Sequence, residues 1–308
     1  MRSHLRLALF VFLLASAPAR SDPAFAIEIA GAKIAVTFAS DGPPQALVRE
    51  WISDSAKAVA AYYGKFPVSE LRILVVPVEG SGVRSGKSYG YNGAAIRVSL
   101  GKSTIRDQLR DDWVMPHEMV HLAFPSVPDA HVWIEEGLAT YVEPWARLMI
   151  GNLSEKEVWS ELVYGLPKGL PRAGDAGLDR THTWGRTYWG GALFCLLADI
   201  EIRKRTANKY GLRDGLRAIV AAGGTIEKQW PLAKAFAVAD TAVGVPVLTE
   251  LYERMKETSV SPDLGALWSE LGIIAKDGVI RFDDSAPLAH VRQAMADDYS
   301  RREVGTIR

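Results

Sequence analysis

The chain lacks several features that would place it in other protein classes. Its 308 residues include one cysteine, Cys195, so no disulfide can form within the chain and the fold depends on its hydrophobic core. The 36 basic and 36 acidic residues balance without long runs of one sign, and this composition gives no reason to expect nucleic acid as a partner. What is left is an ordinary globular composition, 48% hydrophobic and 23% charged, with enough length for a large core.

The N-terminus has the pattern of a secretory signal. Basic residues precede an apolar stretch, 7–17, of about eleven residues, and small-residue cleavage sites follow at Ala17 and Ala19. This stretch is short for a helix that spans a membrane, and no later segment is apolar enough to span one. We therefore expect a signal peptide over residues 1–19 and export to the periplasm or the medium, with an uncleaved anchor as the alternative.

The most specific motif in the chain is His117-Glu118-Met119-Val120-His121. Positions i and i+4 lie on one face of a helix, so His117 and His121 can hold the same Zn²⁺ through their imidazole nitrogens. Glu118 then lies beside the metal, where its carboxylate can take a proton from an attacking water. The apolar neighbours of the motif indicate a half-buried helix, in which these polar side chains are costly without a metal or partners.

Glu136, one residue before Gly137, is the predicted third zinc ligand. Asp129 is the expected N-cap of the second helix, which places Glu136 about two turns into that helix, where it can face the first one. Glu135 points about 100° away, and His131 is a rival ligand at the helix start. Two histidines and one carboxylate leave a fourth position open, as in catalytic rather than structural zinc sites.

The motif from His117 to His121 and the later Trp133-x-x-Glu136-Gly137 segment resemble the gluzincin, or thermolysin-like, zinc metallopeptidases. The glycyl and alanyl aminopeptidase-type families are the most similar. The resemblance implies that the glutamate directly before the glycine, Glu136, is a zinc ligand. It also implies Zn²⁺ as the cofactor and a peptide or protein as the substrate, with hydrolysis of a peptide bond as the reaction.

The resemblance extends to a Tyr-x-Lys-Gly segment of those families, for which this chain has Tyr188-Trp189-Gly190-Gly191. It implies that Tyr188 donates a hydrogen bond to the oxyanion that develops during hydrolysis. Glycine replaces lysine at Gly190. His182, in the loop before Tyr188, is a second candidate for the same role, since loops of this kind carry catalytic groups.

The order of predicted elements favours an α+β fold, with a small mixed sheet and a thermolysin-like zinc-helix module followed by a mostly helical C-terminal region. We expect strands within 25–38, 71–78, 94–100 and 279–282, helices over 46–63, 155–163, 188–205, 212–222, 226–239 and 247–256, a last helix ending near Met295, and loops over 80–90 and 167–184. The sheet and the catalytic module would occupy residues 20–153. Residues 154–308 would form a helical subdomain that completes the cleft.

The motifs favour a zinc peptidase but leave its type open. Tyr91–Leu100 is the expected edge strand, able to pair with the extended backbone of a substrate. The stretch Gly90–Ala94 corresponds to the amine-binding strand of the alanyl aminopeptidases and has no carboxylate, which favours an endopeptidase. Glu135 could supply the missing charge. The alternatives are a catalytically silent gluzincin-like binding protein and a structural zinc site.

Overall fold

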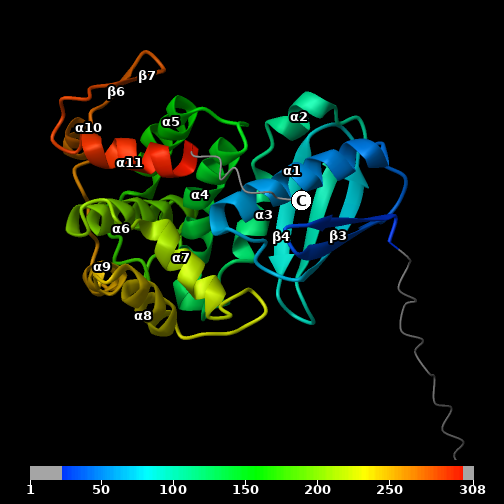
Figure 1. The fold of residues 1–308 in the computed structure, drawn as a ribbon, viewed down its shortest axis with the longest axis horizontal. Helices are drawn as coiled ribbons and strands as arrows, with labels where there is room; N and C mark the ends of the chain where they lie inside the picture. The colour runs from blue at the N-terminus through cyan, green and yellow to red at the C-terminus, as the bar shows by residue number, and fades with distance from the viewer. Residues whose placement is uncertain (1–22, 301–308) are drawn as a thin grey trace, which may run out of the picture.

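A computed structural model describes residues 23–300, and the predicted signal peptide lies outside these residues. Figure 1 shows the sheet, crossed by helix α1, on the right and a cluster of helices on the left, with α3 where the two parts meet. One cluster of buried hydrophobic side chains includes residues from both sides, so they share a core. The chain is a mixed α/β protein with a small sheet and a helical C-terminal region.

The sheet has five strands in the order β1-β2-β3-β5-β4. Strands β1 (Phe25–Ile29) and β2 (Ala32–Phe38) form a hairpin, strands β3 (Glu70–Val78) and β5 (Ala95–Gly101) continue the sheet parallel to β2, and β4 (Val83–Tyr89) pairs antiparallel with β5. Alternate side chains of β3 are buried, as expected for a strand with one face on the core. The predicted strands within 25–38, 71–78 and 94–100 are therefore confirmed.

Strand β4 lies at the edge of the sheet, and two predictions about this region were wrong. The segment Tyr91–Leu100 does not form the edge, because β5 lies between β3 and β4. Residues 80–90, predicted as a loop, contain β4. One of the glycines that suggested a loop has a tertiary role: a Cβ atom on Gly86 would lie 2.5 Å from Glu118 Cγ, so only glycine lets the strand approach the motif helix.

The helices before residue 170 build the frame of the molecule. Helix α1 (Gln45–Tyr63) connects β2 to β3 and packs against both α3 (Val114–His121) and α4 (Val132–Met149). The remaining elements of this part are α2 (Arg106–Arg110), the 3-10 turns η1 (Asp129–His131) and η2 (Leu166–Gly169), and α5 (Glu155–Gly165). Among the described residues no helix combines the length and the apolar character needed to cross a membrane.

The C-terminal part is mostly helical, as predicted. It contains the π-helical turn η3 (Arg186–Gly190), α6 (Gly191–Arg205), α7 (Leu212–Ala221), α8 (Leu232–Val243), α9 (Val247–Met255), α10 (Leu264–Leu271), the hairpin of β6 (Ile273–Lys276) and β7 (Val279–Phe282), and α11 (Ala289–Ser300). The sequence did not reveal α10 and β6, and α11 continues beyond Met295.

The helix predicted over 226–239 begins later, at Leu232, directly after Pro231. The residues before it are held by the loop that follows α3. The Ile226 amide donates to the Leu122 carbonyl at 3.2 Å, and the Trp230 amide donates to the Ser126 carbonyl at 3.1 Å. These tertiary hydrogen bonds satisfy the backbone outside a helix, which is why the apolar periodicity of 226–231 misled the prediction.

Helices α4 and α6 cross at two glycines with their backbones in contact. A Cβ atom on Gly137 would lie 2.3 Å from the Gly191 carbonyl carbon, and one on Gly191 would lie 2.1 Å from the Trp133 carbonyl oxygen. Neither position can hold a larger residue without moving a helix. Because Glu136 precedes the first glycine and Tyr188 lies on the turn before the second, this crossing sets the spacing between the two side chains.

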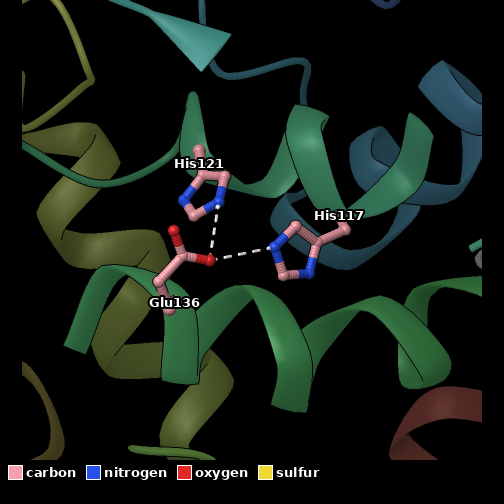
Figure 2. A group of neighbouring side chains, drawn as sticks. All are labelled: His117, His121 and Glu136. Carbon is pink, nitrogen blue, oxygen red and sulfur yellow. Dashed lines mark hydrogen bonds and ion pairs between the residues drawn. The ribbon is translucent and has the colours of Figure 1, made fainter. Parts of the chain in front are cut away.

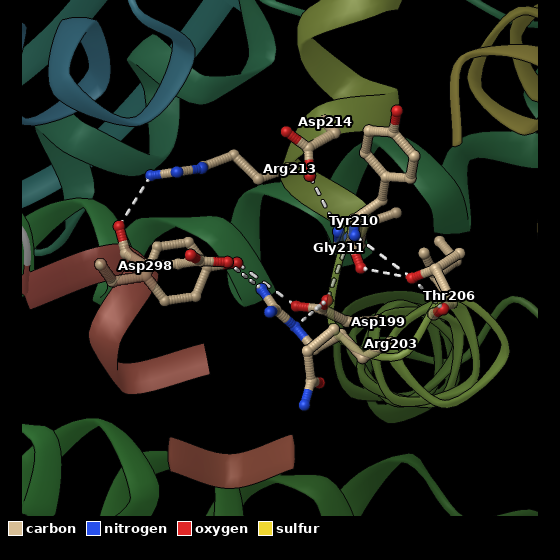
Figure 3. A network of polar contacts seen from close by, with 12 residues as sticks. Asp199, Arg203, Thr206, Tyr210, Gly211, Arg213, Asp214 and Asp298 are labelled. Carbon is tan, nitrogen blue, oxygen red and sulfur yellow. Dashed lines mark hydrogen bonds and ion pairs between the residues drawn. The ribbon is translucent and has the colours of Figure 1, made fainter. Parts of the chain in front are cut away.

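A buried polar network holds α6 in place (Figure 3). Asp199, which is fully buried, accepts hydrogen bonds from Arg203 Nε at 2.9 Å, from the Leu212 amide at 3.0 Å and from the Tyr141 hydroxyl at 2.8 Å. Arg203 Nη2 in turn donates to Asp298 at 2.8 Å. The network joins α4, α6, α7 and α11, and its charges are paired, as buried charges must be.

Candidate active site

Helix α3, which carries the motif, begins where Asp112 satisfies its first backbone donors. The buried carboxylate of Asp112 accepts hydrogen bonds from the Val114 amide, the Met115 amide and the Trp51 indole, each at 3.0 Å. Burial raises the pKa of Asp112, and the three donors oppose this shift because they stabilise the ionised form. Pro116 lies in the first turn, where its missing amide costs no hydrogen bond. The motif therefore lies on a helix with a capped start.

Glu136 lies on α4 facing α3, while the adjacent Glu135 has a different partner. Glu135 Oε1 accepts a hydrogen bond from the Val127 amide at 2.7 Å, so this carboxylate holds the loop before α4. Burial raises the pKa of Glu135, and the Val127 amide opposes the shift. The predicted N-cap was wrong: Asp129 starts the turn η1, and α4 begins at Val132.

The rival ligand His131 belongs to another cluster, centred on Asp179. His131 Nδ1 lies 3.0 Å from Asp179 Oδ1, which also accepts a hydrogen bond from the Trp133 indole at 2.7 Å. The Tyr252 hydroxyl donates to Asp179 Oδ2 at 2.7 Å. Asp179 therefore connects the 167–184 loop to α4 and α9. His131 contacts Asp179 rather than the motif histidines.

Three potential metal ligands converge between α3 and α4 (Figure 2). Glu136 Oε2 lies 3.2 Å from His117 Nε2 and 3.5 Å from His121 Nε2, and the three ligand atoms all lie within 4.8 Å of one another. His117 is buried, and His121 and Glu136 are partly exposed. The structure thus brings together the three residues that the sequence predicted as zinc ligands.

The spacing of these atoms suits zinc. In a tetrahedral site with bonds of about 2.0–2.1 Å, two ligand atoms lie about 3.3–3.4 Å apart. The two separations from Glu136 Oε2, 3.2 and 3.5 Å, bracket this value. Two imidazoles and one carboxylate are also the donor set of catalytic zinc sites, which keep a fourth position open. His117, His121 and Glu136 therefore fit Zn²⁺ in both chemistry and spacing.

The charges of the cluster shift His117 and Glu136 toward the protonation states that bind metal, and shift His121 the other way. Burial lowers the pKa of His117 although Glu136 opposes the shift. Burial would also lower the pKa of His121, but the neighbouring carboxylates of Glu136 and Glu118 raise it overall. Partial burial would raise the pKa of Glu136, yet hydrogen bonds from the two imidazoles hold it well below its usual range. An ionised carboxylate beside imidazoles is a site that a cation can enter by displacing protons.

Glu118 is held between the motif helix and the edge strand of the sheet. Ser88 Oγ lies 2.5 Å from Glu118 Oε2 and also donates to the Glu118 carbonyl at 2.8 Å. Gly86, on the same strand, packs against the Glu118 side chain. The residue is buried, with 8% of its surface exposed. Strand β4 therefore fixes the position of this carboxylate next to the cluster.

Tyr188 lies over the cluster from the helical side. Its ring stacks on the His117 imidazole, with centroids 6.1 Å apart, and on the Trp184 indole at 5.8 Å. Burial raises the pKa of Tyr188 to about 12, and the charge and hydrogen bond of Glu136 add to the shift. The hydroxyl therefore stays protonated at neutral pH and can donate a hydrogen bond.

The glycine at the lysine position of the family segment has a structural explanation. A Cβ atom on Gly190 would lie 3.2 Å from Leu178 Cδ2, 3.3 Å from the Gly169 carbonyl oxygen and 3.5 Å from Arg186 Nη1. A lysine at this position would add a second cation beside the buried Arg186 guanidinium, which would repel it. Gly190 thus lies in a closely packed region next to Tyr188.

Two cavities flank the cluster and meet at Tyr188, which lines both. The first, of about 370 Å³, is lined by Glu118, His121, Glu135 and Glu136 together with Gly86, Lys87 and Ser88 of β4. The second, of about 550 Å³, is lined by His117 and by the aromatic side chains of Trp113, Tyr164, Trp184 and Trp189. His182, the second candidate for the oxyanion role, is exposed and lines neither cavity.

The structure also adds site residues that sequence reasoning missed. Asp112 could have been identified from the sequence, because aspartate is a preferred N-cap residue and this one lies just before the motif helix. Ser88 and Trp184 carried none, because strand β4 was not predicted and the loop that holds Trp184 has no regular pattern. Their contacts with Glu118 and Tyr188 depend on tertiary structure alone.

No protein-family model and no curated protein matches the sequence, so comparison with known proteins rests on solved structures. Among solved structures, an aminopeptidase N family protein from Idiomarina loihiensis matches with a TM-score of 0.59 and 14% identity over 82% of this chain and 49% of the other. A two-domain M1 zinc metallopeptidase mutant bound to L-arginine matches with a TM-score of 0.50 and 17% identity, covering 79% of this chain and 52% of the other.

A third match is an M1 zinc metallopeptidase mutant from Deinococcus radiodurans, bound to a Tyr-Ser-Ala substrate. Its TM-score is 0.50 at 17% identity, and the match covers 79% of this chain and 53% of that protein. The chain therefore spans about half the length of the solved structures it matches. At these identities the likeness establishes the fold alone, which is similar to that of these M1 zinc metallopeptidases.

Proposed function

We propose that this chain is an exported zinc-dependent peptidase. One observation carries the proposal: three potential zinc ligands, His117, His121 and Glu136, converge beside the carboxylate of Glu118 and the hydroxyl of Tyr188. The shared fold with zinc metallopeptidases supports the same class of reaction. Export rests on the signal-like pattern of residues 1–19, and N-terminal sequencing of the mature protein would test it.

Zn²⁺ held by the three ligands would supply a Lewis acid that polarises the scissile carbonyl and acidifies water. Glu118 acts as the general base, taking the proton of the attacking water and passing it to the leaving amine. Because Ser88 engages one carboxylate oxygen of Glu118, the other oxygen carries the proton. The alternating roles of this one carboxylate complete the hydrolysis without a second acid.

Tyr188 stabilises the negative charge that develops on the carbonyl oxygen. Replacing Tyr188 by phenylalanine is expected to lower kcat by about 10²–10³-fold with little change in KM, because the hydroxyl acts mainly in the transition state. Steady-state kinetics with a quenched peptide would measure this. Tyr210→Phe, outside both cavities, serves as the matched control. An unchanged kcat in the Tyr188 variant would assign the ring a packing role only.

We propose that the substrate backbone adds to the outer edge of β4. In the described part of the chain β4 pairs only with β5, so its other edge is open. Lys87 and Ser88 of this strand line the cavity next to Glu118. An extended peptide there would gain main-chain hydrogen bonds, and its side chains would reach the flanking cavities.

The experiment that tests the function combines zinc analysis with a peptide assay. We expect stoichiometric zinc and cleavage of a quenched peptide library that a chelator abolishes and added zinc restores. Stoichiometric zinc without chelator-sensitive cleavage would instead indicate a silent binding protein, and unfolding on zinc removal would then indicate a structural site. Comparing free with N-acetylated peptides separates the types: an aminopeptidase that uses Glu135 for the substrate amine would reject the acetylated series.

A further inference from the structure

Arg186 is a buried cation without an acidic partner at hydrogen-bonding distance. Its surface is 2% exposed, and Nη1 donates a hydrogen bond to the Gly169 carbonyl at 2.7 Å. Nε and Nη2 have no acceptor within residues 23–300. Burial lowers the pKa of the guanidinium, and the charge of Asp175 opposes this shift from a distance. Unpaired donors on a buried cation are costly unless a group from outside the chain accepts them.

Arg186 lines a cavity of about 280 Å³ formed by the loop before η3. Lys168 and Arg172 line it too, and neither forms an ion pair with any described residue. Asp175 is the acidic lining residue, and its Oδ2 already accepts a hydrogen bond from the Arg172 amide at 2.8 Å. Three cations thus face one carboxylate, which gives the cavity a positive potential.

This cationic cavity adjoins the aromatic side of the candidate active site. Lys168 and Trp184 line both cavities. The Trp184 indole stacks on Tyr188, and Tyr188 stacks on His117. A group bound beside Arg186 would therefore be separated from the reacting bond by a short stack of aromatic rings.

We propose that Arg186, Lys168 and Arg172 bind a small oxyanion, of the carboxylate or sulfate type. Guanidinium groups bind such planar or tetrahedral anions through charge-assisted hydrogen bonds, and Arg186 has two donors that await an acceptor. The anion could be a carboxylate of the peptide substrate that extends past Trp184, or a free inorganic anion. The first source rests on the proposed peptidase function, whereas the binding of an anion does not.

Calorimetric titration with inorganic sulfate at constant ionic strength tests the site without any need for activity. We expect the double variant Lys168→Gln, Arg172→Gln to weaken sulfate binding at least about tenfold, and Arg186→Gln to weaken it further. Lys156→Gln, an exposed lysine of α5 outside the cavity, is the control and should bind like the parent. Comparison between variants is essential, because sulfate also stabilises proteins non-specifically.

The site would be rejected if the parent did not bind sulfate, or if the parent, the double variant and the control bound it equally. The double variant keeps the test decisive even if Arg186→Gln fails to fold, since Lys168 and Arg172 are both exposed. A parent that shows no binding would mean that water, rather than an anion, completes the donors of Arg186.

Kinetics with paired peptides then identify the source of the anion. If the substrate supplies it, peptides with a free C-terminal carboxylate will have a KM about tenfold below that of their amides in the parent but not in the double variant, and sulfate will compete. If both peptides are cleaved alike while sulfate binds, the occupant is the free anion. If no peptide is cleaved, the proposed peptidase function fails, and calorimetry still decides the anion site.

Discussion

Replacing Glu118 by glutamine is expected to reduce peptide hydrolysis by about 10²–10⁴-fold while zinc remains bound. The amide has nearly the shape of the carboxylate but cannot accept the proton of water at neutral pH. Ser88 can still hydrogen-bond to the amide, and the side chain still packs against Gly86, so the local structure should persist. The loss should appear in kcat rather than in KM.

Single-turnover and steady-state assays, with zinc measured on the same samples, would check this result. Glu28→Gln offers the same chemical change on an exposed position of β1, at the opposite edge of the sheet, and should retain full activity. A Glu118→Gln protein that hydrolysed peptides as fast as the parent would show that another group is the general base, and the proposed mechanism would be wrong.

The second large effect is expected at Glu136. Glu136→Gln should weaken zinc binding by more than about 100-fold, because it removes the one anionic ligand. The loss of a residue that only supports a ligand already lowers metal affinity by about 10–100-fold, and the loss of a ligand should lower it more. It also removes the carboxylate that accepts from both imidazoles, so His117 and His121 lose their common partner. Competition with a chromogenic chelator would measure the affinity, and activity should fall in parallel.

Glu135→Gln is the matched control for this experiment. It changes the adjacent residue in the same way, but the Glu135 carboxylate is bound to the Val127 amide rather than to the cluster. We expect it to keep zinc affinity within a few-fold of the parent. The opposite pattern, with zinc lost in the Glu135 variant and kept in the Glu136 variant, would reassign the third ligand.

Local sequence patterns predicted the parts of the site that lie on single helices. The i, i+4 spacing of His117 and His121 needs only a helix, and α3 provides it. The regular strands and most helices followed from hydrophobic periodicity for the same reason, since each pattern is contained in a few consecutive residues. Such patterns carry no information about which elements lie side by side.

The errors arose where tertiary contacts determine the local structure. Strand β4 has a glycine at position 86 because Gly86 packs against Glu118, and this contact is invisible in the local pattern. Strand β5 is an inner strand because β4 pairs antiparallel with its outer side, and a run of apolar residues does not specify this pairing. The segment before α8 is not helical because two of its amides donate to the loop after α3, at Leu122 and Ser126.

The contact between Gly137 and Gly191 has a consequence for the order of folding. These glycines are about fifty residues apart in the chain, so their helices meet only after a long loop has closed, whereas α3 and α4 are near neighbours in sequence. Contacts between distant residues slow folding more than local ones do. A refolding chain would therefore assemble His117, His121 and Glu136 before Tyr188 reaches them, and it would acquire metal before it could hydrolyse a peptide.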